Sequence, residues 1–149
     1  MRLIIKILLI AGLLSCKSNP DNEEDQYVST DEPVALSQDQ ESESYKRGKE
    51  VYMDFCITCH LADGKGIPGT FPPLDGSDWL TEKRAESIHA VKYGLKGFIE
   101  VNGEEYNNVM TPFGLTDQEV ADVMNYINNS WSNNIEKPVT EEEVAEIVK

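Results

Sequence analysis

The sequence has few basic residues, and this shortage limits what the protein can bind. Thirteen lysines and arginines stand against 27 acidic residues, which gives a formal net charge of −14 and an isoelectric point of about 4.4. Nucleic acids attract basic surfaces and repel acidic ones, so this balance argues against nucleic-acid binding. It favours partner proteins that present basic residues.

Long apolar runs are also missing. The N-terminal run LIIKILLIAGLL, at residues 3–14, is interrupted by Lys6. It is shorter than the roughly 20 apolar residues that a membrane-spanning helix needs. Because a basic start precedes this short apolar region, we interpret residues 1–15 as a secretory signal peptide.

The end of this run indicates how the mature chain is attached to a membrane. Leu-Leu-Ser-Cys at residues 13–16 resembles the lipobox of bacterial lipoproteins. The resemblance implies cleavage before Cys16 and attachment of lipid to that residue, and more than one acyl chain gives stable anchoring. We therefore expect a protein that is lipid-anchored on the periplasmic side of the cell envelope. The alternative is an ordinary signal peptide that leaves Cys16 free.

Residues 16–44 lack the apolar residues that a folded segment needs. Positions 17–44 contain nine acidic residues, one lysine and no hydrophobic period. Such a segment cannot bury enough apolar surface to offset the loss of conformational entropy on folding. We predict an acidic linker between the lipid anchor and a domain at residues 45–149, although its first residues could also act as a sorting signal.

Strand-like alternation is absent from the domain, whereas helical periodicity recurs. One helical pattern starts at Ser44, and a second covers about 81–94 and ends before Gly94. A third begins with the capping box Thr116-Asp117-Gln118-Glu119, and a short terminal helix is expected at about 140–148. Glycine- and proline-rich loops are expected at 61–79 and 95–114. The sequence therefore predicts an all-α fold.

Cysteines are scarce, and two of the three lie in the sequence CITCH at residues 56–60. A structural zinc site needs four ligands, usually from two close pairs, but the chain has only this pair and one further histidine, His89. A redox dithiol of the thioredoxin type needs a βαβ setting, which the helical pattern does not provide. A disulfide remains open in an oxidising compartment, but it leaves His60 unexplained.

Covalently attached haem accounts for all three residues of the motif. Positions i and i+3 of a helix share a face, so Cys56 and Cys59 can both reach the vinyl groups along one haem edge. The next residue, His60, can then bind the iron. The sequence therefore predicts one covalent haem c, attached through Cys56 and Cys59.

At this point the sequence resembles the class I c-type cytochromes, and the resemblance covers about 45–149. It implies the cytochrome c fold, with three main helices around a single haem. The family places a glycine and an aromatic residue ahead of the haem cysteines, and here these are Gly48 and Tyr52. They pack in the family against an apolar and an aromatic residue of the last helix, which Val123 and Tyr126 match.

The resemblance also implies the axial ligands of the iron. His60 is one, and a methionine from the loop ahead of the last helix is the other. Met110 occupies that loop, although Thr111 separates it from Pro112, whereas the family usually has methionine followed directly by proline. His89 is the alternative ligand, but its charged neighbours favour a surface position.

Two further pocket residues follow from the resemblance. Pro72 stands twelve residues after His60, and its carbonyl in the family accepts a hydrogen bond from Nδ1 of the ligand histidine. That bond fixes the ring and raises its basicity. Leu74 matches a leucine that packs on the haem face. Trp79 and Tyr106 are expected either to reach the haem propionates or to pack in the core.

These features predict a single-haem electron-transfer protein of the bacterial cell envelope, and not an enzyme, because both axial positions are filled. Its partners should be redox proteins. The segment DGKGIPGTFPPLDGSDWL, the segment VNGEEYNNVM and the C-terminal tail are similar to haem domains found with copper nitrite reductases and haem–copper oxidases. Two alternatives stay open: a permanent haem-bearing subunit of such a complex, or a haem sensor or peroxidase-like protein if Met110 is not a ligand.

Overall fold

The computed structural model describes residues 38–149, with side chains from residue 43 onward. The expected signal peptide at 1–15, the lipid site at Cys16 and most of the linker at 16–44 lie outside these residues. Within 38–149, no helix is both long and apolar enough to cross a membrane. The structure therefore describes the domain and not the expected lipid anchor.

The first helical segment is continuous and leads directly to the cysteines. Helix α1 (Gln38–Val51) continues through one π-helical turn, η1 (Tyr52–Cys56), into α2 (Ile57–His60). The helix begins at Gln38 and not at Ser44, within the range that the sequence assigned to the linker. Because helix growth adds one hydrogen bond per residue once a nucleus exists, the packed part of α1 can extend through polar residues that have no hydrophobic period.

The remaining helices follow the predicted pattern, and the fold is mostly helical, as expected. The elements are α3 (Asp78–Glu82), α4 (Arg84–Tyr93), β1 (Ile99–Val101), β2 (Glu104–Tyr106), α5 (Asp117–Asn128) and α6 (Glu141–Glu146). The capping box at Thr116 is confirmed, since Glu119 N–H donates to the threonine hydroxyl and the glutamate bonds back to the Thr116 amide. The helix expected over 81–94 starts earlier, at Asp78, and breaks at Lys83, where φ is −127° and ψ is 53°.

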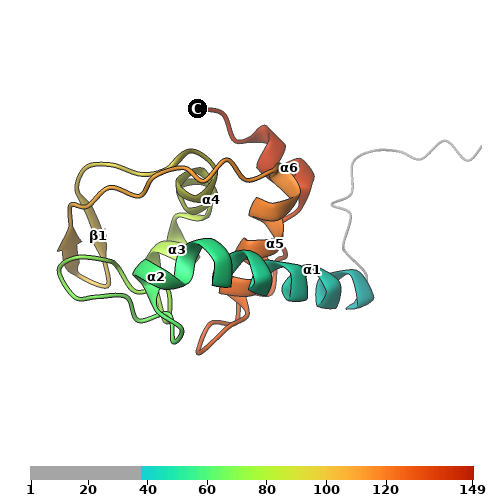
Figure 1. Cartoon of the computed structure of the whole chain (residues 1–149), viewed down its shortest axis with the longest axis horizontal. Helices are drawn as coiled ribbons and strands as arrows, with labels where there is room; N and C mark the ends of the chain where they lie inside the picture. Colours follow the sequence, from blue (N-terminus) through green and yellow to red (C-terminus); the bar gives the residue numbers. More distant parts are fainter. Residues whose placement is uncertain (1–37) are drawn as a thin grey trace, which may run out of the picture. The chain divides into compact units, whose positions relative to one another are not determined.

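The sequence interpretation missed one hairpin, formed by the antiparallel strands β1 and β2. The two turn residues have positive φ, 52° at Asn102 and 76° at Gly103. Asn-Gly is the preferred pair for such two-residue hairpin turns. Each strand has only three residues, so the period-2 alternation was too short to recognise. In Figure 1 the hairpin lies at the end of the domain away from the start of α1.

Helices α1 and α5 cross in close contact, and Figure 1 shows them side by side. A Cβ atom added to Gly48 would overlap the backbone carbonyl of Asp122 and lie 3.0 Å from the Cβ of Tyr126. Only a residue without a side chain allows two backbones to approach so closely. Tyr52 is fully buried at this crossing, with its ring centroid 5.2 Å from that of Tyr126. Gly48 thus fixes the distance between the two helices.

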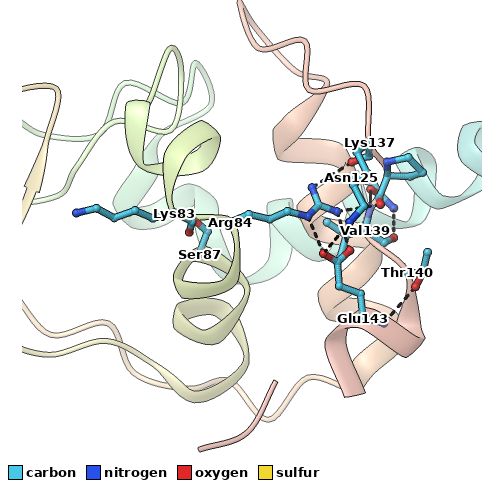
Figure 2. Close-up of polar contacts among 9 residues, drawn as sticks. Lys83, Arg84, Ser87, Asn125, Lys137, Val139, Thr140 and Glu143 are labelled. Carbon is cyan, nitrogen blue, oxygen red and sulfur yellow. Dashed lines mark hydrogen bonds and ion pairs between the residues drawn. The ribbon is translucent and has the colours of Figure 1, made fainter. Parts of the chain in front are cut away.

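The last part of the chain, residues 135–149, crosses α4 and α5, and we call it the C-terminal strap. Arg84 on α4 donates from Nε to Glu143 at 2.7 Å and from Nη2 to the Pro138 carbonyl at 2.9 Å. Asn125 on α5 makes two hydrogen bonds with the backbone of Val139, at 2.7 and 2.9 Å. Figure 2 shows that the two sets of contacts lie close to each other. They hold α6 against the two helices.

Acid is expected to weaken the strap through Glu143. The hydrogen bond from Arg84 lowers the pKa of the Glu143 carboxyl below 4.5. Because its folded pKa is depressed, the pair stabilises the fold above about pH 4.5 and loses this contribution as the pH falls through the lower folded value. The free energy of unfolding, measured with urea, should fall between pH 7 and pH 3 in both proteins. We expect this fall to be about 1–2 kcal/mol smaller in Glu143→Gln than in the parent protein. Equal acid destabilisation in both proteins would contradict this assignment.

Candidate functional site

The two cysteines and His60 lie where the first helical segment ends. The N–H of Ile57 bonds to the carbonyl of Tyr52, which makes this turn π-helical, and such turns occur frequently at functional sites. Cys56 is buried and Cys59 is half-buried. Burial, followed by the neighbouring Cys59, raises the pKa of the Cys56 thiol to about 12. Cys56 is therefore a neutral thiol at physiological pH.

His60 is held by the segment that follows it. Its Nδ1 lies 3.0 Å from the carbonyl oxygen of Pro72, and a carbonyl can only accept, so Nδ1 carries the proton and Nε2 keeps a lone pair. Burial lowers the pKa of His60, an effect that the hydrogen bond to Pro72 opposes. The helix ends at once, because Leu61 has a φ of 64°, and its carbonyl accepts a 2.7 Å hydrogen bond from the Tyr52 hydroxyl. His60 is thus a fixed, neutral imidazole that can bind a metal.

Met110 is positioned by a short bridge to the end of α4. Leu95 and Met110 pair antiparallel through two backbone hydrogen bonds of 2.9 Å. Gly94 has a φ of 81°, and a Cβ there would lie 2.6 Å from the Met110 carbonyl and 2.9 Å from Pro112. A side chain at position 94 would therefore clash with the backbone of the loop that carries Met110.

Both cysteines, His60 and Met110 line one cleft. It consists of two adjoining cavities of about 690 and 610 Å³, including space open to solvent. The cavities share six lining residues: Cys56, His60, Pro72, Leu95, Ile99 and Met110. The cleft brings together residues from the first helical segment and from the loop before α5.

The walls of the cleft are mostly apolar and include the residues that the sequence singled out. Leu74 and Trp79 line one cavity, together with Met124 and Ile127 of α5, and Tyr106 lines the other. The Tyr106 hydroxyl donates to Glu104 at 3.0 Å. A half-buried apolar cleft with two thiols, one neutral imidazole and one thioether suits haem, which needs apolar walls and these donor atoms. Within the described residues, no group of three or more histidine, cysteine, aspartate or glutamate side chains could hold a metal ion.

Other residues considered as ligands lie elsewhere. His89 is on α4, and its ring centroid is 5.2 Å from that of Tyr93. Met53 is 50% exposed on the turn that precedes the cysteines. Neither residue lines the cleft. Met110 lines the first cavity together with His60 and both cysteines, whereas Met124 lines only the second cavity.

The four residues that the sequence analysis assigned to helix packing lie where the first helical segment crosses α5. Gly48 and Tyr52 of α1 and η1 contact Tyr126 of α5, and Val123 is fully buried in the same core. Sequence reasoning missed Leu95, Ile99 and Phe71, which also line the cleft. The only local signal for Leu95 is its position after the helix-ending Gly94, and no periodicity indicates the other two.

Comparison with known proteins identifies the family to which the chain belongs. The family model for cytochrome c matches residues 45–131. Cytochrome c-552 of Thermus thermophilus is 41% identical over 109 residues, which cover 67% of this chain and 82% of that protein. The gluconate 2-dehydrogenase cytochrome c subunit of Pantoea cypripedii is 37% identical over 111 residues, covering 68% of this chain and 24% of that subunit.

A more distant relative is the cbb3-type cytochrome c oxidase subunit FixP of Bradyrhizobium diazoefficiens, 30% identical over 88 residues that cover 56% of this chain and 29% of that subunit. The family model spans more than half of this chain, and the Thermus protein is matched over most of its length. The chain therefore belongs to the cytochrome c family: it is a class I, single-haem c-type cytochrome that carries covalently bound haem c and transfers electrons.

Proposed function

We propose that Cys56 and Cys59 attach the haem and that His60 and Met110 are its axial ligands. The observation that carries this assignment is that all four side chains line the same cleft. Each thiol adds its sulfur and its hydrogen across one vinyl group, so two thioether bonds form and no atom is lost. The neutral imidazole offers Nε2, and the methionine offers a soft sulfur, which raises the reduction potential relative to two histidines.

The side chains around the cleft then determine what the bound group can do. Haem supplies a one-electron couple between ferric and ferrous iron. If His60 and Met110 both bound the iron, no position would be left open for an exogenous ligand, and the protein would act as a carrier and not as an enzyme. The apolar walls exclude water, and the hydrogen bond from His60 to Pro72 holds the imidazole in one orientation. Little has to move when the electron arrives or leaves.

An apolar rim surrounds the mouth of the first cavity and provides a docking surface for redox partners. Phe55, Val109 and Phe113 line this cavity and are 39%, 63% and 42% exposed. The rings of Phe55 and Phe113 are in contact, with centroids 5.5 Å apart. Redox encounters are small and transient, and such a rim can form one without long-lived ion pairs. The net charge of −14 acts at longer range and steers basic partners toward the protein.

We further propose that the protein works in the bacterial cell envelope, lipid-anchored through Cys16 on the periplasmic side, with the acidic linker between anchor and domain. Its electrons pass between respiratory proteins. Some relatives are named as cytochrome subunits of dehydrogenases or of a cbb3-type oxidase, which supports partners of these kinds. The similarity noted above adds copper nitrite reductase as a candidate acceptor.

A role as a permanent subunit of such a complex is the second candidate, because several relatives are subunits. Purification from membranes in mild detergent distinguishes the two functions. A mobile carrier is expected to separate from its oxidase or reductase as a monomer, whereas a subunit is expected to co-purify with it in fixed stoichiometry.

The axial role of Met110 can be tested by replacing it with alanine. We expect Met110→Ala to retain its covalent haem, to lose the far-red charge-transfer band of the oxidised protein and to have a lower reduction potential, because sulfur no longer stabilises the ferrous state. Met53→Leu is the matched control, since Met53 is 50% exposed, does not line the cleft and should keep the band. If the band persists in Met110→Ala, another methionine supplies the sulfur and the assignment of Met110 is wrong. A parent protein that lacks the band would instead support the sensor or peroxidase-like alternative.

A further inference from the structure

Three residues shortly after the end of α5 contact the loop that follows His60 and contains Pro72. We call residues 61–77 the histidine loop, and Trp131, Ser132 and Asn133 the loop clamp. The clamp bonds to both ends of the loop: Trp131 Nε1 donates to the Ala62 carbonyl at 3.0 Å, and Asn133 Nδ2 donates to the Leu74 carbonyl at 2.9 Å. Segments far apart in the sequence are thus joined beside the metal-binding histidine.

Asn133 makes the most contacts of the three. Its Nδ2 also donates to the Ile127 carbonyl of α5 at 2.9 Å, and its Oδ1 accepts from the Gly76 amide at 2.9 Å. Ser132 adds a 3.0 Å hydrogen bond from its amide to the Asp75 carboxylate, and its hydroxyl donates to the same oxygen. One amide side chain therefore ties the second end of the histidine loop to a rigid helix.

Trp131 has an unfavourable backbone conformation that its contacts offset. Its φ is 56°, a left-handed conformation that is unfavourable for a residue other than glycine. This turn lays the indole on Gly64, where an added Cβ would lie 2.6 Å from the ring. The indole also meets the edge of Tyr52, with centroids 5.5 Å apart. Strain of this kind, kept by surrounding contacts, indicates a functional constraint.

Hydrogen bonds within the histidine loop connect the residues that the clamp contacts to His60. The Gly64 carbonyl accepts hydrogen bonds from the amides of Leu74 and Asp75, at 2.7 and 3.0 Å, so the two ends of the loop are joined. Gly66 bonds to the His60 carbonyl at 3.0 Å and packs against Pro72, where an added Cβ would lie 2.5 Å from the oxygen. That oxygen is the acceptor of the 3.0 Å bond from His60 Nδ1. The clamp therefore fixes the two atoms of this bond relative to each other.

We propose that the loop clamp positions the Pro72 carbonyl against His60 and thereby tunes the reduction potential of the haem. The inference rests on the proposed role of His60 as an axial ligand. A strong bond from Nδ1 makes the imidazole a better electron donor and stabilises ferric iron, so a looser clamp favours ferrous iron. No residue of the clamp lines either cavity, so its loss removes no side chain from the walls of the cleft and is expected to act on the hydrogen bond.

The test compares two asparagine-to-alanine variants of the full-length holoprotein. Asn133→Ala removes two hydrogen bonds to the backbone of the histidine loop and one to the Ile127 carbonyl of α5. Asn125→Ala is the matched control, because Asn125 likewise bonds to backbone through both side-chain atoms, but to Val139 of the C-terminal strap. Both are expected to keep their haem and their far-red band, so the proposed haem ligation is checked separately from the tuning.

We expect Asn133→Ala to shift the equilibrium between oxidised and reduced protein about threefold toward the reduced form, which is about 28 mV at 59 mV per tenfold for one electron. The His60 Nδ1 proton of the reduced protein should exchange with solvent faster by about tenfold, whereas Asn125→Ala should leave both quantities unchanged. Trp131→Phe, which removes a single hydrogen bond, should shift the potential less and in the same direction. An unchanged potential in both clamp variants, or an equal shift in Asn125→Ala, overturns the proposal.

Discussion

The double variant Cys56→Ser, Cys59→Ser is expected to mature without covalently bound haem. Both sulfurs face one cleft, and neither serine hydroxyl adds to a vinyl group under the same conditions. The measurement is the intact mass of the purified protein together with its visible spectrum. The parent should exceed its polypeptide mass by one complete haem, because thioether formation releases no atom, and the variant should show the polypeptide mass alone. Helix content should also fall, since two adjoining apolar cavities lose their contents.

The third cysteine supplies the control. Cys16→Ser leaves the CITCH motif intact, so this variant should retain a full complement of haem while losing the expected lipid and its attachment to membranes. If the double variant still carried one covalent haem per chain, the assignment of Cys56 and Cys59 as attachment sites would be wrong. If Cys16→Ser lost its haem, the division between anchor and haem domain would be wrong instead.

Gly48→Ala is expected to destabilise the protein strongly, although it adds only one methyl group. In most exposed helix positions, glycine-to-alanine stabilises by about 0.5–1 kcal/mol. At Gly48 the new Cβ overlaps the carbonyl of Asp122, so α1 and α5 must move apart at their crossing. We expect a loss of about 3 kcal/mol in the free energy of unfolding. About 1 kcal/mol shifts the melting temperature of a domain of this size by roughly 4–8 °C. The melting temperature of Gly48→Ala should therefore fall by about 12–24 °C.

The neighbouring residue provides the matched comparison. Lys49 is on the same helix and is exposed, so Lys49→Ala should change the free energy of unfolding by less than about 0.5 kcal/mol. Thermal and urea unfolding of the holoproteins, followed by far-ultraviolet circular dichroism, measure both variants. Should Gly48→Ala prove as stable as the parent, the close backbone contact described above is not required for folding.

Local patterns predicted most of the helices and, besides the break at Lys83, failed at three points for identifiable reasons. The capping box at Thr116 predicted the start of α5, because a cap depends on residues within one turn. The hairpin was missed since its strands are too short for a period to appear. The early start of α1 at Gln38 was missed because helix extension depends on the packed nucleus and not on the extending residues. The π-helical turn at Tyr52–Cys56 has no signal in a single sequence.

The candidate site was predictable to the extent that its residues are close in sequence. Cys56, Cys59 and His60 form one motif whose spacing already carries the chemistry. Met110 depended on the family resemblance, since nothing near it in the sequence indicates a ligand. The loop clamp at 131–133 was not predicted at all, because its partners at 62–76 are distant in the sequence and no repeated pattern connects them.

The sequence by itself determined the haem motif, the acidic charge and the glycine that permits two helices to touch, because each depends on residue type or on spacing within a few turns of chain. Only the tertiary structure decided that Met110 and His60 line the same cleft, that the C-terminal strap crosses α4 and α5, and that Asn133 bonds to the histidine loop. These features are contacts between distant segments. Their formation depends on how the whole chain packs, and that information is spread over many residues at once.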